Sequence, residues 1–213
     1  RMNFLMQYDV NDWPIVYAHF PSKDALNYYN LSKVMETINV NIKTWTTSNY
    51  VQKRILQEGD KTHEGWVRIN NLIKRGYNYQ AACQLTTLGT DRVMKKDVNG
   101  GDAEHIFSNY NDAVYVSEIL INRFGEKEDK VVKTKEFTKE VSFLWQKLQK
   151  IGGNSYATEN MVEFIKCLPE DKVIEIKRAK KTNDGVSKDV NRTKILNALF
   201  KDFTAHKNIQ LGN

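Results

Sequence analysis

The stretch from Tyr28 to Ile69 constrains the fold most, because short apolar segments and turn-forming residues alternate within it. Four apolar side chains in its first part have the spacing of one helix face: Leu31, Val34, Met35 and Ile38. Asparagines in 39–45 favour a turn, and a second helix is expected over Tyr50–Glu58, ending at Gly59. A tight turn over 59–65 and a strand over 65–69 should follow, since that segment carries strand-forming residues. The predicted order is therefore helix, turn, helix and hairpin, which is typical of a winged helix-turn-helix.

The segments before and after this stretch predict further elements. Residues 2–20 have the alternation and β-branched content of strands. A short helix is expected over 79–90, and the polar run with Gly100-Gly101 predicts a boundary near 97–102. Helical spacing then predicts helices over 135–150, 158–168 and 190–206, and Gly152-Gly153 should end the first of them. Two segments stay ambiguous: 113–124 is a helix or a strand, and 173–176 is a short strand or the edge of a helix.

These elements together predict an α+β fold in two parts. A winged helix-turn-helix domain is expected over residues 1–98, followed by a mainly helical accessory or interaction region over 102–213. The chain has 213 residues, of which 40% are hydrophobic, so it can bury one large core or two small ones.

The basic residues favour a role with nucleic acid in the first part of the chain. The net charge is +6, and residues 33–96 contain eleven basic and five acidic residues. This segment thus carries the whole excess of positive charge, and the net charge of the rest of the chain is zero. We therefore expect the attraction to phosphate to be concentrated around the opening stretch.

Short motifs in residues 28–77 resemble the fungal APSES DNA-binding domain and the related viral and phage KilA-N domain. They are Tyr29-Asn30-Leu31-Ser32 at the first helix, Trp45 before the second, Lys53 to Glu58 within it, and Gly65-Trp66-Val67 at the wing. The resemblance implies a winged DNA-binding fold, sequence-specific binding of double-stranded DNA, and a role in transcription regulation without catalysis or a cofactor.

The helix near 47–58 is the expected reader of the major groove, because polar and basic side chains on a helix can meet base edges. The side chains expected at the groove are Thr47, Asn49, Gln52, Lys53 and Arg54. Those expected at phosphates or the adjacent groove are Lys43, Lys61, Thr62 and His63.

One alternative is a non-catalytic interaction or scaffold module that keeps the fold without binding DNA. The predicted wing is short and contains acidic residues, and the net charge is modest, which favours this reading. A protein partner would then bind through the helical C-terminal region.

Residues 175–181 hold two further motifs. Lys177, Arg178, Lys180 and Lys181 resemble a nuclear import signal or a phosphate patch, which should be exposed. Nuclear localisation is expected on this reading, or cytoplasmic localisation if the source is viral or bacterial. Glu175-Ile176-Lys177 has the Glu-x-Lys spacing that metal-dependent nucleases use on a strand, which leaves a nuclease as a remote alternative.

The remaining chemistry-bearing residues are sparse. Cys83 and Cys167 are far apart without metal-ligand spacing, and the four histidines are scattered, so we expect no metal site and two unpaired thiols. No apolar run reaches the ~18 residues of a membrane span, and no signal peptide is expected.

Overall fold

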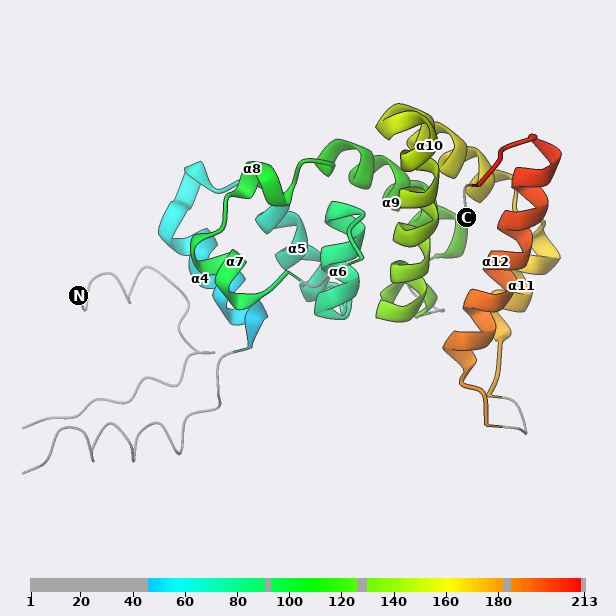
Figure 1. The fold of residues 1–213 in the computed structure, drawn as a ribbon. Coiled ribbons are helices and arrows are strands. Elements are labelled where there is room, and N and C mark those ends of the chain that lie inside the picture. Colours follow the sequence, from blue (N-terminus) through cyan, green and yellow to red (C-terminus); the bar gives the residue numbers. More distant parts are fainter. Residues whose placement is uncertain (1–45, 91–92, 126–129, 182–184, 212–213) are drawn as a thin grey trace, which may run out of the picture. The chain divides into compact units, whose positions relative to one another are not determined.

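The computed structural model describes residues 46–90, 93–125, 130–181 and 185–211 (Figure 1). Helices account for 79% of this part of the chain, and no strand occurs in it. The prediction of an α+β winged fold is therefore wrong for these residues, which form an all-α structure. The strands predicted over 2–20, the helix over 31–38 and Lys43 lie outside the described residues.

The helices follow one another with short connections. In chain order they are α4 (Thr47–Glu58), the 3-10 turn η2 (Gly59–Lys61), α5 (Glu64–Lys74), α6 (Tyr79–Thr87), α7 (Lys95–Gly100), α8 (Ala103–Ile106), α9 (Tyr110–Phe124), the 3-10 turn η3 (Val131–Lys133), α10 (Lys135–Cys167), α11 (Glu170–Arg178) and α12 (Lys188–His206).

The predicted wing is the first part of helix α5. Gly65 N–H donates a hydrogen bond to His63 Nδ1 (3.0 Å), so His63 caps the helix in place of the predicted turn. Trp66, Ile69 and Leu72 are buried on one helical face. Gly65 is a close-approach site, because a Cβ there would lie 2.5 Å from the Phe107 ring. Helical spacing of large apolar side chains thus outweighs the strand preference of Val67 and Ile69.

Helix α6 is a core helix. Residues 81–87 are all buried, and the helix packs against α5, α9 and α10. It is joined to α5 by residues 75–78, where Gly76 has a positive φ of 85°. This connection has the form of a helix-turn-helix, but a second helix that is buried along its length has no free face for a DNA groove.

Helix α10 is a hairpin of two helices. Trp145 Nε1 donates to Thr158 Oγ1 at 3.0 Å, although residues 13 apart in one straight helix would be separated by about 20 Å. The chain reverses at Gly153, whose backbone (φ 80°, ψ −174°) is outside the helical region. The predicted helices over 135–150 and 158–168 and the stop at Gly152-Gly153 are confirmed.

The other C-terminal predictions resolve as helices. Residues 113–124 lie in α9, residues 173–176 lie in α11, and the predicted helix over 190–206 is confirmed as α12. Helix α12 packs on both α10 and α11. Helices α4, at 47–58, and α6, within 79–90, also match their predictions.

One buried cluster runs through these helices, from Val51 in α4 to Phe200 in α12. Residues 47–213 form one compact unit. The predicted boundary near 97–102 falls inside this unit, at the end of α7 and before α8.

Candidate nucleic-acid interface

The predicted groove-facing residues of α4 are half-buried. Val51 is the buried residue of this helix, which packs against α5 and α7. Thr47, Asn49, Gln52 and Lys53 are all of intermediate exposure, and Thr47 and Asn49 already have partners.

Arg54 forms hydrogen bonds between α4 and the end of α7 instead of facing solvent. Its Nη1 donates to the carbonyl oxygens of Asp97 (3.3 Å), Val98 (3.1 Å) and Gly101 (3.2 Å), at the end of α7. Its Nε donates to Glu58 Oε1 at 2.7 Å, and the guanidinium lies 4.9 Å from the Trp66 ring centroid. The side chain is 16% exposed, and both Nε and Nη1 donate hydrogen bonds within the protein.

The predicted phosphate contacts at 61–63 lie among acidic groups. His63 stacks on Phe107 at 4.7 Å, and its Nε2 is 4.0 Å from Glu104 Oε1. Thr62 Oγ1 donates to the Ile55 carbonyl at 3.3 Å. Lys61 is exposed, but it shares a pocket of about 390 Å³ with Glu58 and Glu104. A phosphate here would meet carboxylates as well as cations.

The zero net charge outside residues 33–96 conceals two opposite segments. Residues 97–129 contain two basic and eight acidic residues, and residues 130–213 contain seventeen basic and ten acidic residues. The acidic segment folds back on the first basic segment: Arg68 Nη2 lies 2.9 Å from Glu118 Oε1, and Glu104 lies beside His63. The tertiary structure thus places acidic residues near α4 and α5, where the excess of positive charge was predicted to attract phosphate.

A pocket of about 350 Å³ between α5 and α9 shows the same compensation. Arg68 lines it and also donates to Ser117 Oγ at 2.6 Å. Glu64 and Tyr110 line it too. Partial burial raises the pKa of the Tyr110 hydroxyl, and the Glu64 carboxylate raises it further, whereas Arg68 lowers it. Arg75 lines this pocket as well, so two arginines and one glutamate meet there, and the charge of Arg68 is paired with Glu118.

Part of the second basic segment forms a stripe along the outer face of the first half of α10, where Lys139 and Lys150 are exposed and Lys147 is half-buried. Lys139, Phe143, Lys147 and Lys150 lie within a narrow arc of this helix, at spacings of three and four residues. Phe143 is 44% exposed, and Lys147 Nζ lies 4.5 Å from its ring centroid. The opposite face of the same helix is buried through Leu144, Trp145 and Leu148.

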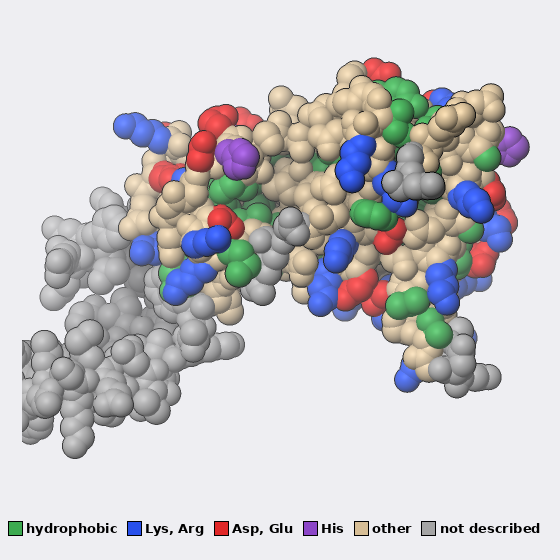
Figure 2. Space-filling model, viewed as in Figure 1, with side chains coloured by type: hydrophobic (Ala, Val, Ile, Leu, Met, Phe, Trp, Pro, Cys, Tyr) green, Lys and Arg blue, Asp and Glu red, His purple; other side chains and the backbone are tan. Residues whose placement is uncertain are grey.

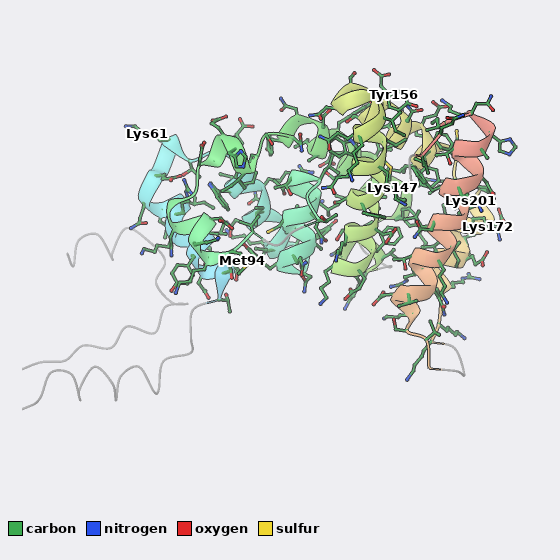
Figure 3. All side chains as sticks on the ribbon, in the orientation of Figure 1. Lys61, Met94, Lys147, Tyr156, Lys172 and Lys201 are labelled. Carbon is green, nitrogen blue, oxygen red and sulfur yellow. The ribbon has the colours of Figure 1, made fainter. Side chains whose placement is uncertain are left out.

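Helix α12 extends this stripe. Asn197 Nδ2 donates to Glu140 Oε1 at 2.8 Å, which joins the two helices at the edge of the stripe. Lys194 and Lys201 are exposed on α12 and lie on one side of it, because they are seven residues apart. Figure 3 labels Lys147 on α10 and Lys201 on α12 on the viewed side, and Figure 2 shows basic side chains over both helices.

We call this surface the lysine face. It consists of Lys139, Phe143, Lys147 and Lys150 on α10, and Lys194 and Lys201 on α12. Within the part of the chain that the structure describes, none of its five lysines forms an ion pair. The two nearest acids of α10 are engaged: Glu136 lies 3.6 Å from Lys135 Nζ, and Glu140 accepts from Asn197. Sequence reasoning missed this surface, although helical spacing of lysines around Phe143 would have indicated it.

The Lys177–Lys181 segment forms the end of α11 and the start of the next loop. Arg178, Lys180 and Lys181 are exposed, and Lys177 is half-buried with a partner. Arg192 Nε and Nη2 donate to the carbonyls of Ile176 and Lys177, both at 3.2 Å. The backbone of this segment is thus anchored while three of its cations face solvent.

The Glu-x-Lys pattern of a nuclease is on a helix, not on a strand. Glu175 and Lys177 lie in α11, where residues two apart do not share a face. Glu175 Oε2 accepts from Lys172 Nζ at 2.7 Å, and Ile176 between them is buried. The strand that the nuclease hypothesis required is therefore absent at these residues.

Other reactive groups are dispersed. Cys83 is buried and Cys167 is exposed, and neither forms a disulfide. Among the described residues, no three His, Cys, Asp or Glu side chains come together as a possible metal site. A groove of about 430 Å³ between the second half of α10 and α12 is lined mainly by apolar residues, including Phe164, Leu199 and Phe203. In the same described ranges, no helix is both long and apolar enough to cross a bilayer.

Comparisons of this chain with protein-family models, with curated proteins and with solved structures find no match. The similarity of residues 28–77 to the APSES and KilA-N domains remains a hypothesis, and residues 28–45 of that segment lie outside the described part of the chain.

Proposed function

We propose that this protein is a non-catalytic nucleic-acid-binding module that contacts the phosphate backbone through the lysine face. The supporting observation is that five lysines on two adjoining helices have no ion-pair partner among the described residues. Lysine ammonium groups without an ion-pair partner attract phosphates. Their binding releases the counterions that surround the nucleic acid. Rigid helices hold these ammonium groups, since the inner face of α10 is buried in the core.

This proposal keeps the nucleic-acid role that the sequence suggests and moves the contact surface. The α4 residues are half-buried or engaged, and acids from 97–118 lie beside α4 and α5. The scaffold alternative predicts no salt-dependent binding of nucleic acid, so the same titration separates the two functions.

The test is a fluorescence-anisotropy titration of a labelled DNA duplex over a series of salt concentrations. The triple variant Lys139→Gln, Lys147→Gln and Lys150→Gln should bind more weakly than the unmodified protein. Each lost phosphate contact should reduce the slope of log affinity against log salt by about 0.9 on a duplex, so the loss of three contacts should reduce the slope by about 3.

A charge-matched control distinguishes the two surfaces. The variant Lys53→Gln, Lys61→Gln and Lys96→Gln removes three positive charges from the α4–α7 end of the molecule, and its slope should stay close to that of the unmodified protein. If this control loses the slope and the α10 variant retains it, α4 is the contact surface. If the unmodified protein shows no salt-dependent binding of the duplex or of a single strand of the same length, the proposed function is wrong.

A further inference from the structure

Phe143 is an exposed aromatic ring in the middle of the lysine face. Of the phenylalanines that the structure describes, it is the one that is exposed, at 44%. Phe124 and Phe137 are fully buried, and Phe164 and Phe200 pack edge to face in the core. Phe143 is thus partly open to solvent on a helix whose opposite face is packed in the core, so a ligand can reach the ring.

The neighbours of this ring indicate what kind of ligand fits. Lys139 and Lys147 lie one helical turn on either side of Phe143, and Lys150 lies one turn further. Lys147 Nζ sits over the ring, 4.5 Å from the centroid, so cation and aromatic group form one unit. A ligand that satisfies both groups must carry closely spaced negative charges together with flat apolar faces.

Single-stranded nucleic acid has this chemistry. Its phosphates match the lysines, and its unpaired bases expose the π-faces that stack on aromatic side chains. In a duplex the base faces are covered by neighbouring base pairs, so a ring on a convex helix surface has little access to them.

We propose that Phe143 is a stacking platform for an unpaired base, and that the lysine face therefore prefers single-stranded to double-stranded nucleic acid. This inference rests on the proposed function, because the lysines hold the backbone that brings the base to the ring. It adds a substrate class and a specificity-determining residue to that function.

The test compares three probes of similar length: a labelled thymine oligonucleotide of about 20 nucleotides, an abasic strand with the same phosphate spacing, and a duplex. Phe143→Ala should weaken binding of the thymine strand by roughly 5- to 150-fold, the usual effect of losing one stacked base. Binding of the abasic strand and of the duplex should not change, and Phe143→Trp should restore binding of the thymine strand.

Tyr115→Ala is the matched control. Tyr115 is 50% exposed on α9, a helix that also carries Asp112 and Glu118, so removing its ring should leave binding of all three probes unchanged. Circular dichroism checks that each variant is folded.

The possible outcomes separate this inference from the proposed function. If Phe143→Ala binds the thymine strand as tightly as the unmodified protein, while the Lys139, Lys147 and Lys150 variant still loses binding, only the stacking role is overturned. Salt-independent or absent binding of every strand overturns both. Preferential binding of an aspartate- and phenylalanine-rich peptide over the thymine strand would identify a protein partner and also overturn the inference.

Discussion

Arginines and lysines have different roles in this protein. Arg54, Arg123 and Arg192 each donate to backbone carbonyls at the end of a helix: Arg54 at α7, Arg123 at Leu168 after α10, and Arg192 at α11. A guanidinium has several donors in a fixed plane, which suits it to a group of unpaired carbonyls, whereas an ammonium remains well hydrated on the surface. The predicted DNA contacts treated Arg54 and Lys53 as equivalent cations, but their surroundings differ.

We predict that Arg54→Met destabilises the fold by about 2–3 kcal/mol, because three carbonyl oxygens and Glu58 lose a charged donor. Lys53→Met, at the neighbouring position, should change the free energy of unfolding by less than about 0.5 kcal/mol. Urea unfolding followed by circular dichroism measures both. Equal stability of the two variants would contradict the structural role of Arg54.

At the scale of elements, local spacing predicted helices better than it predicted turns. The stripes of α10 and α12 have regular apolar spacing and were predicted correctly. The first part of helix α5 was predicted as a turn and a strand because Gly59 and Gly65 bracket a polar run, and because Val67 and Ile69 are β-branched. Gly65 lies inside the helix for a different reason, the close approach of Phe107, which comes from 42 positions further along the chain and has no local signal.

The hairpin within α10 depends on Gly153. Its backbone conformation is accessible to glycine and costs other residues about 1–3 kcal/mol, so Gly153→Ala should destabilise the protein by that amount. Gly100→Ala is the control, because Gly100 is helical with open space around it and should be neutral or stabilising by up to about 1 kcal/mol. Thermal unfolding of the two variants gives the comparison, and a stable Gly153→Ala protein would show that the turn tolerates a side chain.

At the scale of the whole molecule, the distribution of charge is a tertiary property. Acids from α8 and α9 lie against α5, and the lysines of α10 and α12 are left without such partners in the described structure. The hydrophobic core also crosses the predicted domain boundary. Phe107 packs on Trp66 with ring centroids 4.7 Å apart, and Thr138 Oγ1 donates to the buried Gln84 at 2.6 Å.

We therefore predict that residues 1–98 and 102–213, prepared as separate fragments, do not unfold cooperatively on their own. Each fragment would expose apolar surface that the other covers, and Arg54 would lose the Gly101 carbonyl. The fragment 47–213 should show one cooperative transition in urea. A sharp transition for residues 1–98 alone would instead support an independent N-terminal domain.

The sequence by itself determined the helical character of α4, α6, α10 and α12, together with the end of the first half of α10 at Gly152-Gly153. These features depend on residues within a few turns of one another, and periodicity reports such neighbours directly. Only the tertiary structure decided that the predicted wing is a helix, that Arg54 is engaged in the fold, and that the unpaired cations lie on α10 and α12. Those outcomes depend on contacts between residues about 40 to 50 positions apart, such as Arg54 with Val98 and Arg68 with Glu118, which no local pattern encodes.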